Sequence, residues 1–369
     1  MAKVNWTNSG GGDFAIGTNW STGMVPVSSS IANINAVGTG TYTVTSSANE
    51  TVLAITTIPR ATLDLTGIGV FTALAGTGVG ANAGTISVEN GAVFTVGGTV
   101  KNSGIINLNG AGQLLISRDT ILQGGGQITL SLDAGNGGHF NIYGTNTLTN
   151  VDNTISGFGN IGITALVNET NGVIDANNGS NPLVVTGNSL TNAGILESTS
   201  TGGLFLGLPI TNTASGVIGA FGAGSTVTLQ SHTVSGGTLK TGSGGEIVVE
   251  GETFDGSNGH TVNNTGNVVV PGTLSLTLLG TINNSGTITL NGYSNASSQV
   301  IVGAGGVTLA GSGNITLSDS TNNNIIGNGA STTLTNQNAI SGAGTIGCNG
   351  LLLTNQGGDR RHWDQSAYH

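Results

Sequence analysis

The chain repeats one short motif, Asn102-Ser103-Gly104-Ile105-Ile106-Asn107-Leu108, along most of its length. From Gly84 to Gly104 and from Gly266 to Gly286 the step between copies is 20 residues, and from Gly172 to Gly194 and from Gly194 to Gly216 it is 22. A fixed period of this size indicates a repeat architecture, in which each unit buries its apolar face only against its neighbours. Close copies begin at Asn82, Asn192, Asn264 and Asn284, and looser copies centre on Gly172 and Gly216.

Each copy predicts a tight turn followed by a short β-strand. The residue two after the glycine is always Ile, Leu or Val, whereas the residue three after it tolerates Ser, Asn, Asp, Glu and Thr. Alternation with a period of two is typical of a strand that has one buried face. In the turn, we expect the Asn side chain to cap its own backbone and the Gly to adopt a positive φ.

The period also selects among repeat folds. A step of 20 to 22 residues is too short for a helical-hairpin repeat, and the motif lacks the Leu spacing of a leucine-rich repeat. The 66 glycines also disfavour helices, because Gly costs about 1 kcal/mol in a helix interior. The sequence therefore predicts an all-β chain, folded as an elongated parallel β-helix solenoid with 20 to 22 residues per coil.

A longer repeat supports this fold. Residues 101–162 match residues 283–347 as a duplicated block. Within it, 102–110 matches 284–292 and 155–162 matches 340–347. The offset between the two blocks drifts, which indicates short insertions between coils, as surface loops tolerate. Duplication of whole coils is easily accommodated in a solenoid.

The composition divides the chain into three segments. Residues 1–45 contain Trp6, Trp20 and the turn Met24-Val25-Pro26-Val27, and we expect them to cap the open first coil. The alternative is that the two indoles form a sugar-stacking platform. Residues 46–357 form the solenoid. Residues 358–369 are a non-repeat tail of foreign composition, which we interpret as the end of a truncated array, with a C-terminal cap or a recognition tail as alternatives.

Charge and apolar content exclude two classes of partner. The formal net charge is −10 with only 7 Lys and Arg residues, so the basic surface that nucleic acids require is not expected. Because no apolar run approaches about 20 residues, we predict no membrane insertion. The single cysteine, Cys348, excludes an intrachain disulfide, and it matches Ile163 of the duplicated block. We therefore expect Cys348 to be a small buried hydrophobe.

Acidic residues are densest at Glu246, Glu250, Glu252 and Asp255, with His260 nearby. Carboxylates beside a histidine can bind a divalent cation or act as acid and base. However, even spacing on one strand would place the three glutamates on a single face, and we expect that face to be solvated. We predict no catalytic, metal or cofactor-binding residues, and we retain Glu250, Glu252 and Asp255 as weak candidates for a metal site.

Other candidate residues have simpler interpretations. Asp133 and His139 lie in a Gly-rich insertion that the second block lacks in this form, so they indicate a variable loop. A polysaccharide lyase would need clustered bases, whereas Lys101, Arg118 and Lys240 are scattered. Thr-X-Thr does not recur at every coil, which disfavours an ice-binding ladder.

The first 45 residues resemble the opening module of large repetitive exported proteins of Gram-negative bacteria. The resemblance lies in Trp6, Gly11-Gly12-Asp13-Phe14, the segment 18–26 and Gly40-Thr41-Tyr42-Thr43-Val44. The coils are similar to those of autotransporter passengers and filamentous-haemagglutinin-like adhesins. This resemblance implies a right-handed β-helix that is exported to the cell surface or medium for adhesion or biofilm formation, and it transfers no catalytic residue.

We therefore expect a non-enzymatic, extracellular or cell-surface structural and adhesion protein. It would use the β-helix scaffold for multivalent binding of glycans or surface proteins, without a cofactor. Two alternatives stay open, a carbohydrate-active β-helix enzyme such as a polysaccharide lyase or hydrolase, and a phage tail spike-like protein. Turnover of polysaccharides would distinguish the first alternative, and an obligate trimer the second.

Overall fold

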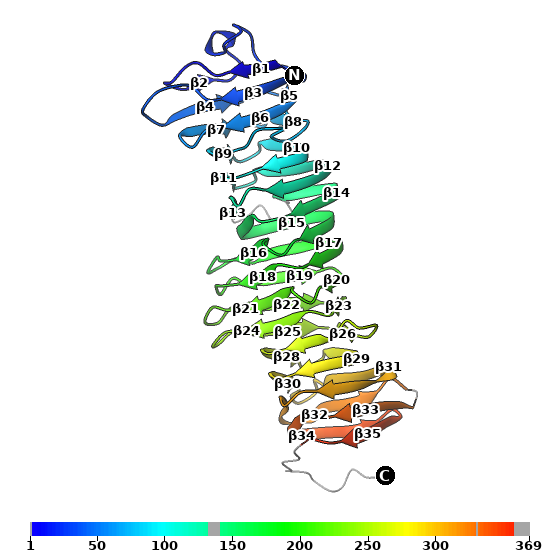
Figure 1. The fold of residues 1–369 in the computed structure, drawn as a ribbon. Coiled ribbons are helices and arrows are strands. Elements are labelled where there is room, and N and C mark those ends of the chain that lie inside the picture. Colours follow the sequence, from blue (N-terminus) through cyan, green and yellow to red (C-terminus); the bar gives the residue numbers. More distant parts are fainter. Residues whose placement is uncertain (1, 132–140, 330, 358–369) are drawn as a thin grey trace. The chain divides into compact units, whose positions relative to one another are not determined.

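The computed structural model describes residues 2–131, 141–329 and 331–357, and these residues form an all-β fold (Figure 1). As predicted, parallel coils stack into a β-solenoid of about 14 turns. The only helix in the described residues is a single 3-10 turn, η1 (Gly17–Asn19), and no helix there is long and apolar enough to span a membrane. The predictions for Asp133, His139 and the tail 358–369 lie outside the described residues.

Contacts divide the chain into two units, residues 1–175 with 181–188, and residues 176–180 with 189–369. In the first unit, β1 (Ala2–Asn5), β3 (Ser30–Ile34) and β6 (Ala54–Thr57) form a three-stranded parallel sheet. Each remaining strand pairs in parallel with a strand of the neighbouring coil. These strands are β2 (Gly12–Asp13), β4 (Tyr42–Ser46), β5 (Glu50–Val52), β7 (Ala61–Leu65), β8 (Val70–Ala73), β9 (Thr85–Val88), β10 (Val93–Lys101), β11 (Ile105–Asn109), β12 (Gln113–Gln123), β13 (Gln127–Ser131), β14 (Ile142–Asn150) and β15 (Thr154–Asn168).

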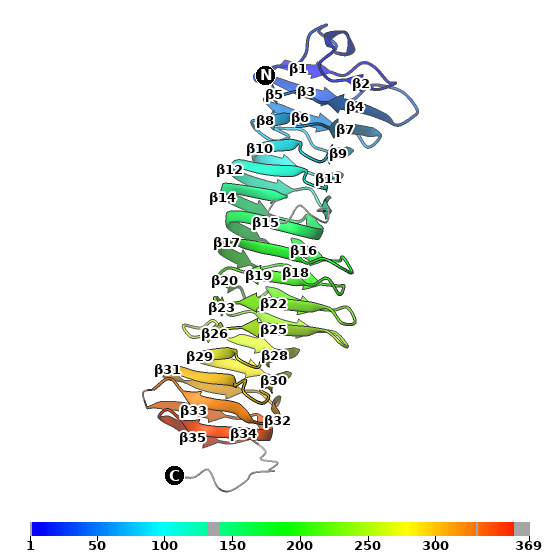
Figure 2. The ribbon, with the colours of Figure 1, turned by 180° about the vertical axis from the view of Figure 1, so that it is seen from behind.

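The second unit repeats this parallel arrangement, which Figure 2 shows from behind. Two strands, β16 (Val173–Ala176) and β17 (Leu183–Asn192), have residues in both units. The others are β18 (Ile195–Ser198), β19 (Leu204–Gly207), β20 (Ile210–Asn212), β21 (Val217–Ala220), β22 (Thr226–Gln230), β23 (Thr233–Ser235), β24 (Thr238–Thr241), β25 (Glu246–Glu250), β26 (Glu252–Gly256), β27 (Val262–Asn264), β28 (Asn267–Pro271), β29 (Ser275–Asn284), β30 (Thr287–Asn291), β31 (Ser298–Ala310), β32 (Asn314–Gly327), β33 (Thr332–Asn336), β34 (Ala339–Cys348) and β35 (Leu351–Asn355).

Aliphatic side chains stack in columns inside the coils. In the first unit, Leu63, Ile86, Ile106, Ile128 and Ile155 are successive register partners, and each is at most 1% exposed. Each such side chain contributes roughly 1.5–3 kcal/mol by its burial. The position two after the motif glycine is buried in every copy, so the predicted strand facing is confirmed: Ile86, Ile106, Ile174, Leu196, Ile218, Val268 and Ile288.

The motif asparagines form hydrogen-bonded ladders inside the fold. The Nδ2 of Asn82 donates to the Oδ1 of Asn102 at 2.7 Å, and Asn102 donates onward to Asn153 at 2.9 Å. All three side chains are fully buried. Asn82 and Asn102 lie on neighbouring parallel coils, one strand spacing apart, whereas Asn153 reaches Asn102 from two coils further along. The predicted capping of the local backbone also occurs, for example from Gly266 N to Asn264 Oδ1 at 3.0 Å.

The prediction for the motif glycine was wrong. Gly84, Gly104, Gly216 and Gly286 are not among the residues with positive φ. Glycine is required at these positions for a steric reason, because the backbone of the preceding coil passes too close to leave room for a side chain. A Cβ on Gly104 would lie 2.0 Å from the carbonyl oxygen of Gly84, and one on Gly286 would lie 2.2 Å from that of Gly266.

In the second unit the asparagine ladder moves from one row of strands to the next. Asn212 ends β20, whose register partners on the next coil are in β23. Asn264 instead pairs in register with Leu239, which itself pairs with Ile218. The second ladder, from Asn264 to Asn284 at 2.7 Å, therefore lies in the row that holds Ile218, the core residue of the earlier copy. Copies of one motif thus occupy two different corners of the coil.

Cys348 is exposed, contrary to the prediction that it is a buried hydrophobe. It ends β34, where it pairs in register with Ile326 of the preceding coil. Burial in a solenoid comes from the coils on both sides. No described strand packs beyond β34, whereas the matching Ile163 is 2% exposed within the stack.

Candidate functional site

The predicted acidic cluster is divided by a corner of the coil. Glu246 and Glu250 lie at the two ends of β25, and Glu252 begins β26. Between the two strands Gly251 has a φ of 80°, which turns the chain and breaks the alternation of side chains. Glu246 is exposed and Glu250 half-buried, whereas Glu252 is 2% exposed. The prediction that the three glutamates share one solvated face was therefore wrong for Glu252.

Glu252 places a buried carboxyl group between the backbone of His232 on the previous coil and an aliphatic column on the next coils. Its register partner on the next coil is Leu276, which pairs in turn with Val300. The Oε2 atom accepts a hydrogen bond from the backbone N–H of His232 at 3.2 Å. Burial raises the pKa of the Glu252 carboxyl to about 7, and the hydrogen bond from His232 opposes that rise. A buried carboxyl with a single partner is costly to ionise, because the charged form loses its hydration.

The other acidic residues bond to nearby donors instead of converging. Gln230 Nε2 donates to Glu250 Oε2 at 2.9 Å, and Asn267 Nδ2 donates to Glu246 Oε1 at 3.3 Å. The backbone N–H of Ser257 donates to Asp255 Oδ1 at 2.9 Å. Throughout the described residues, no group of three or more His, Cys, Asp or Glu side chains is placed to hold a metal ion. The structure does not bring Glu250, Glu252 and Asp255 together as ligands of one ion.

The two tryptophans of the first segment are packed inside. Trp6 is 1% exposed and Trp20 is 2% exposed, and their rings meet edge to face at 4.9 Å between centroids. Phe14 continues the contact to Trp20 at 4.8 Å. Both indole N–H groups donate to backbone carbonyls, Trp6 to Asn8 and Trp20 to Phe14. Their ring faces are covered, so Trp6 and Trp20 do not form a sugar-stacking platform.

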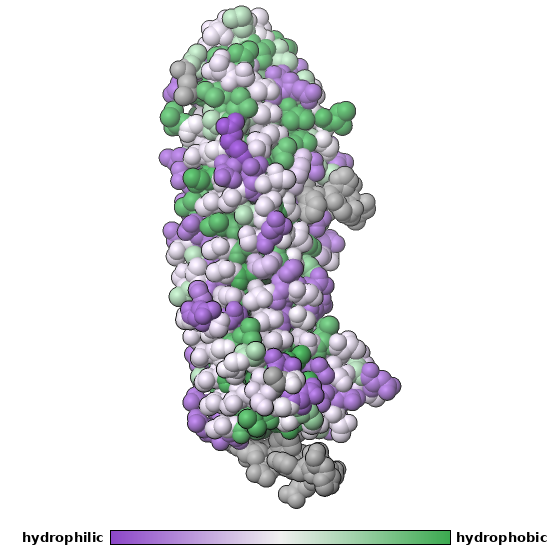
Figure 3. All heavy atoms as spheres, turned by 90° about the vertical axis from the view of Figure 1, so that its right-hand side faces the viewer, coloured by the Kyte–Doolittle hydropathy of each residue, from purple (hydrophilic) through white to green (hydrophobic). Residues whose placement is uncertain are grey.

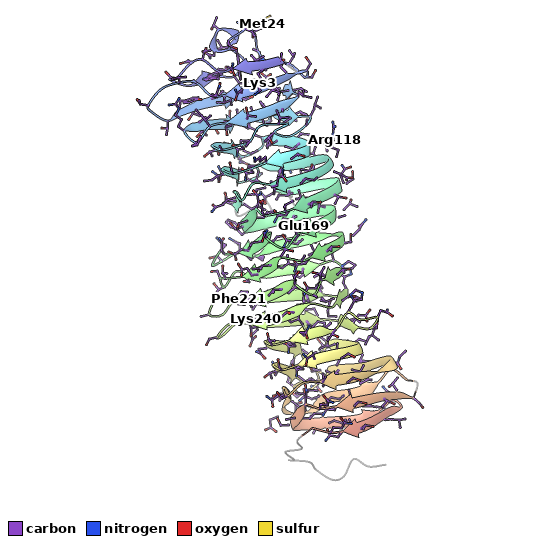
Figure 4. All side chains as sticks on the ribbon, viewed as in Figure 1. Lys3, Met24, Arg118, Glu169, Phe221 and Lys240 are labelled. Carbon is purple, nitrogen blue, oxygen red and sulfur yellow. The ribbon has the colours of Figure 1, made fainter. Side chains whose placement is uncertain are left out.

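A pair of one aromatic and one basic side chain on the second unit was not predicted from the sequence. The Phe221 ring lies over Gly219, where a Cβ would be 2.4 Å from the ring. Gly219 pairs in register with Lys240, which is exposed on the next coil. Figure 4 shows both labelled side chains at the same edge of the neighbouring coils. The local sequence, Val217-Ile218-Gly219-Ala220-Phe221, contains no polar residue that marks this pair, and only the register between coils places Phe221 beside Lys240.

A groove on the three-stranded sheet was also missed. It measures about 220 Å³, and Lys3, Asn33, Thr56 and Val79 contribute to its lining. A chain of hydrogen bonds crosses the strands there, from Thr56 Oγ1 to Asn33 Oδ1 at 2.7 Å and from Asn33 Nδ2 to Asn5 Oδ1 at 2.8 Å. The groove offers amide and hydroxyl groups with one exposed lysine, Lys3, which is labelled in Figure 4. It can hold a polar group, but its lining contains no pair of an acid and a base.

The bases named from the sequence lie on separate strands. Lys101 ends β10, Arg118 lies in β12, and Lys240 lies in β24. The Arg118 side chain lies against Gly97 of the previous coil, where a Cβ would be 2.3 Å from its Cγ. On the face drawn in Figure 3, hydrophilic and hydrophobic residues are interspersed.

Comparison with models of known protein families, with curated proteins and with solved structures gives no match.

Proposed function

We propose that this chain is a non-enzymatic structural and adhesion protein of the extracellular space or the bacterial cell surface. In this proposal the coils are an inert scaffold, and their outward side chains bind glycans or surface proteins at several points. The proposed relation to autotransporter passengers and filamentous-haemagglutinin-like adhesins rests on the motifs of the first 45 residues and on the coil repeat.

The observation that carries the proposal is the contrast between the two faces of one row of strands. Inward, the register partners in the second unit are uniformly aliphatic: Val227, Ile247, Val268, Ile288 and Ile315. Outward, the residue just before each of these changes its chemistry: Thr226, Glu246, Asn267, Thr287 and Asn314. Packing therefore constrains the inside of the row, whereas the outside is free to vary.

This geometry favours binding at many points. Neighbouring parallel strands lie about 4.8 Å apart, so outward side chains on successive coils can meet an extended partner at regular intervals. Weak contacts made together on one scaffold raise the overall affinity without any single deep pocket. In the described residues, the groove beside Lys3 and the Phe221–Lys240 pair depart locally from this regular surface.

The test is a binding assay in which the density of the immobilised ligand is varied. The full chain is passed over glycans and over bacterial surface proteins at several densities, and the same polysaccharides are assayed for new reducing ends or unsaturated products. We expect binding that falls steeply as ligand density decreases, because multivalent attachment depends on simultaneous contacts. Robust turnover of a polysaccharide would replace the proposal with the enzyme alternative. An obligate trimer in light scattering would favour the tail-spike alternative.

A further inference from the structure

The chain contains several Asn-Gly dipeptides, and hydrogen bonds restrain some of them more than others. In such a dipeptide the glycine nitrogen can attack the Cγ of the asparagine side chain. The bond from Cγ to the amide nitrogen then breaks, ammonia leaves, and a cyclic imide forms. Water opens the imide to aspartate or to isoaspartate. The described dipeptides begin at Asn90, Asn109, Asn171, Asn178, Asn258, Asn291, Asn328 and Asn349.

Ring closure needs a free glycine nitrogen and a mobile asparagine. Glycine allows the approach because it has no Cβ. A hydrogen bond from the glycine N–H holds the nitrogen away from Cγ, and a bond to the asparagine side chain or to the backbone carbonyls fixes the peptide. Each such bond must break before the reaction, so each one slows it.

In four of the dipeptides the glycine N–H is engaged. Gly110 donates to Ser131 O at 2.7 Å, and Gly172 donates to Glu169 O at 2.8 Å. Gly292 donates to Asn323 Oδ1 at 2.8 Å, and Gly329 donates to Asn349 O at 3.2 Å. These four nitrogens are held by strands or turns of the coil stack.

In three others the asparagine is fixed. The Oδ1 atoms of Asn90 and Asn178 accept backbone N–H groups, from Ala111 at 3.2 Å and from Ser180 at 2.9 Å. At Asn349 the two backbone carbonyls of the dipeptide accept from Gly329 at 3.2 Å and from Thr332 at 3.1 Å. Rotation of these peptides is therefore opposed by contacts with the rest of the coil.

In the part of the chain that the structure describes, neither the Oδ1 atom of Asn258 nor the backbone carbonyls of Asn258 and Gly259 accept a hydrogen bond. Asn258 is exposed with a φ of 53°, and the exposed Gly259 that follows has a φ of 82°. No atom lies within 4 Å of the position that a Cβ on Gly259 would take. The Asn258 side chain bonds only to Ser257 Oγ, at 3.2 Å, and the turn is closed around the dipeptide from His260 N to Ser257 O. Within the described residues, the Gly259 N–H has no acceptor.

We propose that Asn258 is a site of spontaneous deamidation, at which the folded chain acquires a carboxylate or an isoaspartyl linkage. The new charge appears in the turn between β26 and β27, next to the Asp255 side chain that caps Ser257. The isoaspartyl form lengthens the turn by one backbone atom. His260, at the end of that turn, lies against Gly236 of the previous coil, so the change reaches the stacking of the coils.

The test follows deamidation site by site in the intact chain. The folded protein is incubated at mildly alkaline pH in water enriched in ¹⁸O, digested with pepsin at acid pH, and analysed by mass spectrometry with fragmentation that separates aspartate from isoaspartate. We expect conversion at Asn258 about tenfold or more faster than at Asn109 and Asn291, because those sites must first lose a hydrogen bond. One oxygen from the solvent should enter at Asn258.

Two controls make the outcome decisive. In urea, where the contacts are lost, Asn109 and Asn291 should convert at about the same rate as Asn258. Asn258→Gln keeps an amide in the turn and should abolish the signal there, while the other sites stay unchanged. Equal rates at the three sites in the folded chain would overturn the proposal, as would an Asn258 that stays intact while the unfolded chain converts.

Discussion

Glu252 should make the second unit less stable as the pH rises. Its pKa lies near 7 in the folded chain, against a usual value of 4.5. Below about pH 4.5 the carboxyl is neutral in both the folded and the unfolded chain, so its burial has no ionisation cost. As the pH rises toward 7, the unfolded chain releases the proton first and is favoured. The stability is therefore present at low pH and is lost between about pH 4.5 and pH 7.

The size of this loss of stability follows from the rise in the pKa of Glu252. One pKa unit corresponds to 1.36 kcal/mol, so a rise from 4.5 to about 7 gives a loss of about 3 kcal/mol across this range. Glu252→Gln removes the ionisation but keeps the shape. We expect the free energy of unfolding of this variant to lack that part of the pH dependence, whatever its absolute value.

The measurement is urea unfolding of the full chain from pH 4 to pH 8, read by pulsed hydrogen exchange in peptides that contain β26. Unfolding has to be measured near Glu252 itself, because the coils of a solenoid need not unfold together. Glu250→Gln is the matched control, since it removes the same charge from a half-buried side chain that bonds to Gln230. Burial also raises the pKa of Glu50 and Asp64, so the difference between variants is the quantity to compare. Parallel curves for the wild-type chain and Glu252→Gln would refute the reasoning.

Three further predictions concern the motif itself. Asn102→Ala should lower stability by about 3 kcal/mol, because Asn82 and Asn153 lose their buried hydrogen-bond partner; unchanged urea midpoints for first-unit peptides would contradict this. Gly104→Ala should lower the free energy of unfolding by about 2 kcal/mol or more, because its Cβ would meet a backbone oxygen at 2.0 Å. Gly40→Ala is the control in the same urea titration, and it should be nearly neutral because a Cβ there meets no atom within 4 Å. Ile106→Asp should abolish cooperative unfolding in circular dichroism by burying an unpaired carboxylate at a cost of several kcal/mol. Asn107→Asp, on the outward side, should be nearly silent, and equal effects of the last two changes would mean that the strand faces the other way.

The sequence by itself determined the coil and its inward face. Ile106 and its counterparts are buried because alternation along a strand is a local property, readable from a few consecutive residues. The period of the motif then required that each strand stack on a copy one coil away. Both conclusions needed only the order of residues along the chain.

The tertiary structure decided what each motif residue contacts. Gly104 is needed because the Gly84 carbonyl passes beside it, and Asn264 bonds to Asn284 in a row where Ile218 lies two coils earlier. Glu252 is buried because a corner at Gly251 interrupts the spacing that the sequence suggested. The contacts of Gly104 and Asn264 depend on the register between coils. That register is set by contacts between residues that are distant in the sequence, and no local pattern specifies it.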